Sequence, residues 1–75
     1  MAIFSHEFQK ELRGTYPKGT RIELIRMEDQ WTDLKPGDRG TVTMVDDAGQ
    51  IHMKWDRGSS LALIPGEDQF KVVKE

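Results

Sequence analysis

Residues 35–60, KPGDRGTVTMVDDAGQIHMKWDRGSS, contain the pattern that decides the fold of this chain. Two short runs that alternate between apolar and polar residues, 41–45 and 51–55, are separated by the turn-forming run Asp-Asp-Ala-Gly. A Pro-Gly corner precedes the first run, and Asp56-Arg57-Gly58 follows the second. We therefore predict a pair of antiparallel strands at the centre of the domain.

The alternation within these two strands predicts which side chains are buried. On the first strand, Val42 and Met44 are expected on one face and Thr41, Thr43 and Val45 on the other. On the second strand, we expect Ile51, Met53 and Trp55 to point inward and His52 and Lys54 to point outward. Gly40 precedes the first strand, which suggests a close backbone approach or a bulge there.

Three further strands are predicted on either side of this pair. Residues 20–27, TRIELIRM, place Ile22 and Leu24 on one face, although Ile25 and Met27 break the alternation and indicate a bulge or an outer apolar contact. Residues 60–64, SLALI, are apolar on both faces, and residues 69–73, QFKVV, are expected to bury Phe70 and Val72. A single turn at residues 65–68 precedes the last strand.

A short helix is predicted before the strands, over residues 3–13, where Phe4, Phe8 and Leu12 form one apolar stripe. Ser5 is the expected N-cap and Gly14 the expected end. The predicted organisation is a helical appendage at 1–14 followed by a β domain at 15–75. The stripe could cover the β domain, associate with a partner or a second copy, or belong to a frayed arm.

Composition limits the function classes. The chain has 75 residues and no cysteine, which excludes disulfides and thiolate metal sites. No apolar run approaches the length of a membrane span, so we expect a cytoplasmic protein without membrane contact. The formal net charge is −2 and neither sign collects along the chain, whereas nucleic-acid binders usually show a basic stripe. A folded face could still gather Arg21, Arg39, Lys54 and Arg57, which keeps nucleic acid as an alternative partner.

No set of residues nominates catalysis, a metal or a cofactor. Asp46 and Asp47 lie in a turn without the ligand register of a calcium loop, and we expect them to be solvated. His6 and His52 are expected at the surface, and the serines at 5, 59 and 60 lack the context of a nucleophile. The prediction is a non-enzymatic protein without cofactor or metal.

The order of strands and spacers resembles the small SH3-like barrel, with a long loop after the first strand and a short helical turn before the fifth. The strand run with its Gly-Thr-Val start is also similar to the KOW variant of that barrel. More closely, residues 16–73 resemble DUF4314, a bacterial domain of unknown function. The matching segments are Tyr16-Pro17-Lys18-Gly19-Thr20, residues 34–42, Trp55-Asp56, Gly58-Ser59-Ser60-Leu61 and residues 63–68. The resemblance implies a mainly β, five-stranded SH3-like barrel with a short N-terminal α-helix, found in bacterial genomes and mobile elements, and it implies no activity or functional residue.

The remaining site candidate is the long loop at residues 28–38. Trp31 lies there among acidic residues, with Asp29 and Asp33 nearby and Leu34 as its expected anchor. Trp31 either folds back onto the barrel or contacts a partner, and the acidic neighbours would favour a basic peptide over a nucleic acid. We therefore expect a protein-interaction module of a bacterial or mobile-element system, with a KOW-type nucleic-acid-binding barrel as the alternative.

Overall fold

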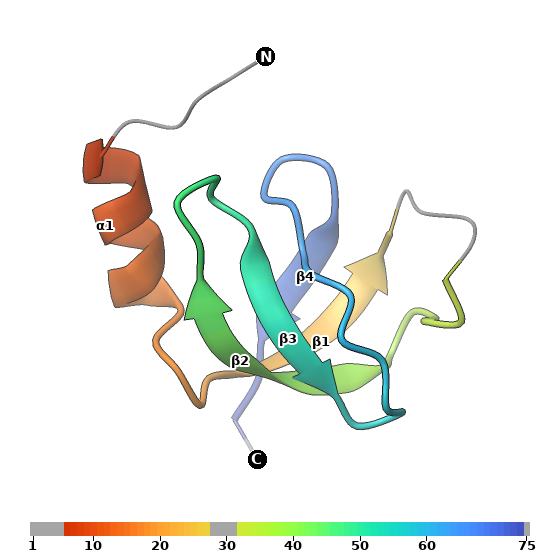
Figure 1. The fold of residues 1–75 in the computed structure, drawn as a ribbon. Coiled ribbons are helices and arrows are strands. Elements are labelled where there is room, and N and C mark those ends of the chain that lie inside the picture. The colour runs from red at the N-terminus through yellow and green to blue at the C-terminus, as the bar shows by residue number, and fades with distance from the viewer. Residues whose placement is uncertain (1–5, 28–31, 75) are drawn as a thin grey trace.

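A computed structural model describes residues 6–27 and 32–74 of the chain, with side chains from Glu11 onward. One helix precedes four strands: α1 (His6–Thr15), β1 (Arg21–Arg26), β2 (Arg39–Val45), β3 (Ile51–Trp55) and β4 (Gln69–Val72). The strands form one antiparallel sheet in the order β3-β2-β1-β4, which curves around a single core (Figure 1). The mainly β class with one short helix is confirmed.

The expected fifth strand at residues 60–64 is wrong. This segment forms one isolated bridge, in which the Ile51 and Leu63 backbones exchange N–H···O=C bonds of 2.9 and 2.8 Å. Two residues earlier, the indole N–H of Trp55 donates to the Leu61 carbonyl at 2.8 Å, and the Leu61 N–H donates to the Ser59 hydroxyl at 3.2 Å. Because these side chains satisfy the Leu61 backbone, the ladder along β3 does not continue. The sheet is therefore four-stranded and unclosed.

A bulge in β2 corrects the predicted burial of that strand. The register between β2 and β3 shifts between Val42 and Met44, which inserts one extra residue into β2. Val42 and Val45 are consequently buried, whereas the Met44 side chain is 53% exposed. The strict alternation that places Met44 beside Val42 fails at this point. A second shift, between Leu24 and Arg26 of β1, confirms the bulge expected from the sequence.

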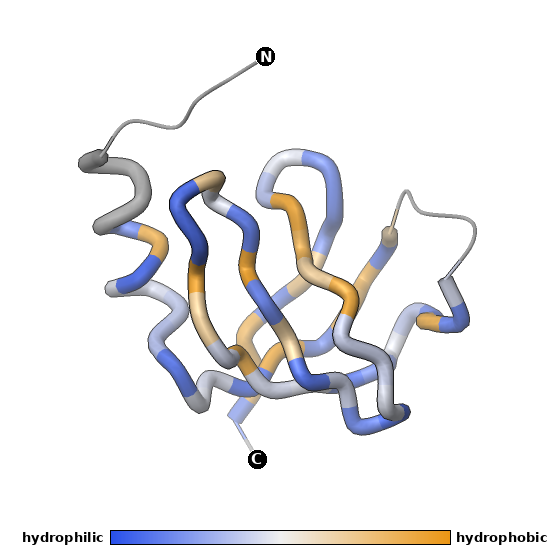
Figure 2. The backbone as a smooth tube through the Cα atoms, viewed as in Figure 1, coloured by the Kyte–Doolittle hydropathy of each residue, from blue (hydrophilic) through white to orange (hydrophobic). Residues whose placement is uncertain are grey.

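The core lies inside the curve of the sheet. Its buried apolar residues are Leu12, Ile22, Leu24, Leu34, Val42, Val45, Ile51, Met53, Trp55 and Leu63. Hydrophobic and hydrophilic residues alternate along β3, whose inward residues are those that the sequence predicts (Figure 2). The buried Trp55 confirms the assignment of that residue to the core. Leu34 is also buried, as expected for the anchor of the long loop.

The helix packs beside β2 and contributes to the core (Figure 1). Leu12 is buried, and Tyr16 just after the helix contacts Phe70 of β4 edge-on, with ring centroids 5.6 Å apart. The helix ends at Thr15, one residue beyond the predicted end at Gly14. The expected roles of Ser5, Phe4 and Phe8 lie outside the residues whose side chains are described.

The last strand is less buried than predicted. Phe70 is half-buried, but Val72 is 49% exposed although it faces the same side of the sheet as the buried Ile22. The reason is that β4 is an edge strand and no further strand covers it among the described residues. The turn before it forms as expected, with the N–H groups of Glu67 and Asp68 both donating to the Ile64 carbonyl.

Candidate functional site

The structure describes only part of the loop that the sequence predicts as a partner site. Trp31 and Asp29 lie outside the described residues, and so does Glu28. Asp33 is exposed at the described end of the loop, next to the buried Leu34. The Leu34 N–H donates to the Thr32 hydroxyl at 3.2 Å, which fixes the return of the loop toward the core. The contact of Trp31 with a basic peptide stays a prediction.

A groove lies between the C-terminal end of α1 and the C-terminal end of β2. Apolar parts of Tyr16, Pro17, Met44 and Val45 line it together with Thr43, and the cations Arg13 and Lys18 are at its rim. The groove exists because the β2 bulge turns Met44 outward on the side that faces the helix. We call these seven residues the α1–β2 groove. Sequence alternation misses it, since a bulge of one residue reverses the predicted side of Met44.

Two cations lie at the rim of the groove, and one of them is paired with a carboxylate. Arg13 holds its position through a 3.4 Å bond from Nε to the Val45 carbonyl and a 3.0 Å ion pair with Asp47. Lys18 makes no ion pair with any described residue. No acidic residue is among the described residues that line the groove. An apolar side chain flanked by carboxylates would therefore match its chemistry.

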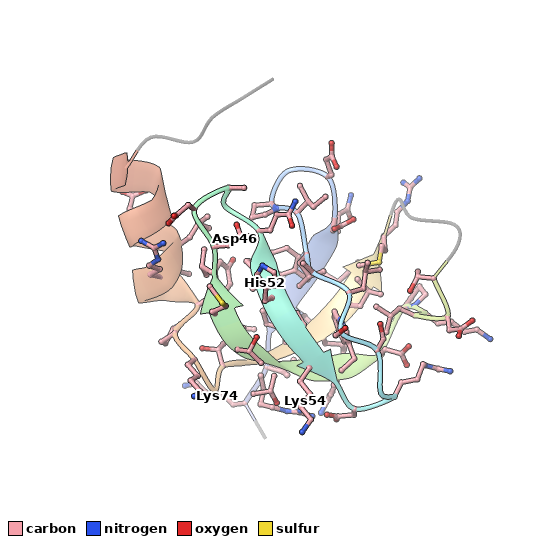
Figure 3. All side chains as sticks on the ribbon, in the orientation of Figure 1. Asp46, His52, Lys54 and Lys74 are labelled. Carbon is pink, nitrogen blue, oxygen red and sulfur yellow. The ribbon has the colours of Figure 1, made fainter. Side chains whose placement is uncertain are left out.

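Ion pairs lie across the outer face of the sheet and between the adjoining turns. Arg21 binds Asp56, Arg39 binds Glu23 at 3.1 Å, and Arg57 binds Asp38 at 2.9 Å. Lys71 of β4 also approaches Glu23, at 3.6 Å. Of the four cations that could gather as a basic face, three are therefore paired with carboxylates. The fourth, Lys54, which is labelled in Figure 3, makes no ion pair with another described residue.

Hydrogen bonds to the Asp46 carboxylate hold the β2–β3 turn together. One Asp46 carboxylate oxygen accepts the backbone N–H groups of Ala48 and Gln50, each at 2.9 Å. The other lies 2.7 Å from Nε2 of His52, and Figure 3 shows the two side chains together at this end of the hairpin. Partial burial acts to raise the pKa of Asp46, but the hydrogen bonds from His52, Gln50 and Ala48 outweigh it and the pKa is lowered. The expectation that both aspartates are solvated is wrong for Asp46, while Asp47 is exposed.

The sequence contains a signal for the contact between Asp46 and His52, which the expectation of a solvated turn did not include. An Asp that starts a tight turn commonly accepts N–H groups two or more residues later, and the hairpin brings the sixth residue onward alongside it. His52 also borders a shallow depression beside β3, lined by Gln50, Ser59, Ser60, Leu61 and Ile64 among others. The Ser59 hydroxyl is engaged with the Leu61 N–H, as predicted for a residue that satisfies the turn backbone. Among the described residues, no three metal-binding side chains gather at one place.

The fold and its surfaces define a small mainly β domain with a helix packed on one strand. The model of the family described as a domain of unknown function, DUF4314, matches residues 5–73. The chain belongs to this family. The match begins at the helix, so the family includes α1 as well as the sheet. No curated protein and no solved structure matches the chain.

The described part of the chain has no helix long and apolar enough to cross a membrane.

Proposed function

We propose that this domain is a non-enzymatic protein-interaction module that binds a partner segment in the α1–β2 groove. We further propose that it works in the bacterial cytoplasm, within a larger or mobile-element assembly. The observation that carries the proposal is Met44, a large apolar side chain that is 53% exposed in a groove beside Tyr16 and Pro17. Large exposed apolar side chains grouped in a groove mark interaction surfaces more often than isolated ones do.

The charges around the groove define the partner. Arg13 and Lys18 stand at the rim of a domain whose formal net charge is −2. A segment with one apolar side chain for Met44 and at least one carboxylate for Lys18 would be complementary to it. Electrostatic complementarity of this kind contributes to specificity and association rate, while burial of Met44 and Tyr16 supplies affinity.

The pairing of the arginines favours a protein partner over a nucleic acid. Nucleic-acid affinity arises largely from cations that neutralise phosphates. Arg21, Arg39 and Arg57 are instead engaged with carboxylates of the same domain. A phosphate backbone would have to displace those carboxylates to use the outer face of the sheet.

Photocrosslinking in the native host tests the groove. Met44 is replaced by p-benzoylphenylalanine, and the same group is placed at Lys35, an exposed position in the Pro-Gly turn, as the matched control. We expect a small number of discrete protein adducts at position 44 and none of these at position 35. Lys18→Glu in the crosslinking chain should reduce the adducts at least fivefold.

Three results would contradict the proposal. Adducts could form equally at both positions, they could be removed by nuclease, or they could persist unchanged with Lys18→Glu. A nuclease-sensitive adduct whose yield falls steeply with salt would favour the KOW-type alternative. Loss of the adducts with Trp31→Ala but not with Lys18→Glu would instead place the contact at the acidic loop near Asp29 and Asp33.

A further inference from the structure

The hydrogen-bonding register leaves the outer edge of β4 open. The Val73 N–H donates to the Arg21 carbonyl at 3.0 Å, and the next pairs along are Ile22 with Val72 and Leu24 with Phe70. In an antiparallel ladder, hydrogen-bonded and non-hydrogen-bonded pairs alternate. The pair Arg21–Val73 is hydrogen-bonded, and the pairs Ile22–Val72 and Leu24–Phe70 lie one and three positions further along the ladder. These two pairs are therefore non-hydrogen-bonded.

The bonds of Leu24 support this assignment. Its N–H donates to the Asp38 carbonyl and its carbonyl accepts the Gly37 N–H, each at 2.8 Å, so both groups point away from β4. The N–H and C=O groups of Phe70 and Val72 must then point away from β1, toward the open edge of the sheet. The β1–β4 register gives neither residue a backbone bond to β1, and no turn or loop of the described chain supplies one.

The two faces of this open edge differ in chemistry. On the inner face, Val72 lies opposite the fully buried Ile22 and yet is 49% exposed. On the outer face, Lys71 lies 3.6 Å from Glu23, but that carboxylate already pairs with Arg39 at 3.1 Å. One carboxylate thus serves two cations, which leaves positive charge at the edge.

We propose that the edge of β4 binds an extended segment of another protein by strand addition, and that the segment has the pattern apolar–acidic–apolar centred opposite Lys71. Backbone bonds to Phe70 and Val72 would supply affinity, the acidic side chain would face Lys71, and an apolar side chain would cover Val72. This surface is separate from the α1–β2 groove and does not depend on it.

Two antiparallel registers of a second copy of the chain fit this edge poorly. Antiparallel pairing of two β4 strands about Lys71 places Lys71 directly opposite itself, which is destabilising. Pairing about Val72 places Lys71 opposite Val73 and Phe70 opposite Lys74, so neither face is matched. Lysine on an exposed edge is a common means of preventing self-association.

NMR titration of the protein with two blocked peptides tests the proposal: Ac-TTVEVTT-amide and its control Ac-TTVKVTT-amide. The glutamate peptide should shift the amide signals of residues 70–73 and slow hydrogen exchange at Phe70 and Val72, which should exchange rapidly in the free protein. We expect it to bind at least fivefold more tightly than the lysine peptide. Lys71→Glu should reverse that order.

Two variants separate the edge from other effects. Val72→Pro removes an N–H that makes no bond to β1, so the sheet should survive while binding of the glutamate peptide falls at least tenfold. Met44→Ala alters the groove and should leave this binding unchanged, so failure of one surface is distinguishable from failure of the other. Equal affinity of the two peptides, slow exchange of the Phe70 and Val72 amides in the free protein, shifts at the groove instead of the edge, or a dimer paired through β4 would each overturn the proposal. If Val72→Pro does not fold, the Lys71→Glu reversal decides.

Discussion

Gly40 lies against the ring of Trp55, and a Cβ atom added to this glycine would be 2.9 Å from Cε3 of the indole. The same atom would lie 3.0 Å from the Trp55 Cα and from the Lys54 carbonyl oxygen, neither of which can move without displacing β3. The pair stands opposite in the β2–β3 register and is buried. The close approach predicted for Gly40 is thus confirmed, and its cause is the tryptophan.

Gly40→Ala should therefore destabilise the domain. Overpacking against a backbone that cannot relax costs about 1–3 kcal/mol. For a domain of this size, each kcal/mol lowers Tm by about 4–8 °C, which thermal unfolding followed by circular dichroism will measure. Gly14→Ala is the matched control, because it sits in α1 and its added Cβ would meet no described atom within 4 Å beyond the adjoining helix backbone. The control should leave Tm unchanged or raise it, and equal losses in both variants would contradict the role of Trp55.

The indole N–H of Trp55 anchors residues 60–64, the segment that the sequence predicts as a fifth strand. Trp55→Phe keeps an aromatic ring in the core but removes the 2.8 Å bond to the Leu61 carbonyl. We expect a loss of about 1–3 kcal/mol, since the partly buried Leu61 carbonyl loses its donor. Hydrogen exchange should accelerate at the Leu63 and Ile51 amides, which form the neighbouring bridge. Unchanged protection of these two amides would show that the bridge does not depend on the indole.

The Asp46 carboxylate organises the β2–β3 turn through three bonds. Asp46→Ala should lower the free energy of unfolding by about 1–3 kcal/mol, because two N–H groups lose their acceptor. Asp47→Ala is the control within the same turn, and it should cost less because that carboxylate is exposed and pairs only across the surface with Arg13. Urea unfolding of both variants compares them. A larger loss for Asp47→Ala would contradict the role assigned to Asp46.

The domain should lose stability in acid. Hydrogen bonds from Arg57 and from the Lys35 N–H hold the pKa of Asp38 below its ordinary value of 3.8, and the Arg21 guanidinium lowers the pKa of Asp56. The unfolded chain therefore binds more protons than the folded one in this range, so the free energy of unfolding decreases as pH falls. The contribution is complete above about pH 5 and is lost as pH falls through 3.8 and the lower folded values.

Thermal unfolding between pH 2 and 7 measures this dependence. Asp38→Asn cannot titrate at this position, so its Tm should decline less between pH 5 and pH 2 than that of the unaltered domain. Asp33 is exposed and makes no hydrogen bond or ion pair with another described residue, and it provides the control as Asp33→Asn. Identical slopes for Asp38→Asn and the unaltered domain would contradict the assignment.

The helix should contribute to the stability of the sheet. Leu12 is buried in the core, and its truncation in Leu12→Ala should cost about 2 kcal/mol or more. Glu11→Ala, one residue earlier and exposed, should change stability by much less. Sedimentation analysis of Leu12→Ala tests the other interpretation of the helix: an unaltered mass with lower Tm indicates packing, whereas a reduced mass with unaltered Tm would indicate self-association.

Local chemistry in the sequence determined much of this protein. Strand alternation identified the inward residues of β3, and Pro36-Gly37 predicted a turn in which Gly37 has a φ of 95°. The bulge in β1 followed from the broken alternation at Ile25. These features depend on neighbouring residues, whose geometry is set by backbone sterics and by the period of the strand.

The tertiary structure alone decided the surfaces. The extra residue in β2 exposes Met44, the Trp55 indole interrupts the fifth strand, and the β1–β4 register opens the backbone of Phe70 and Val72. The ion pairs of Arg21, Arg39 and Arg57 also join segments that lie 16 to 35 residues apart. Each depends on which distant residues the folded sheet brings into register, and the energy of such contacts is not encoded in any local pattern.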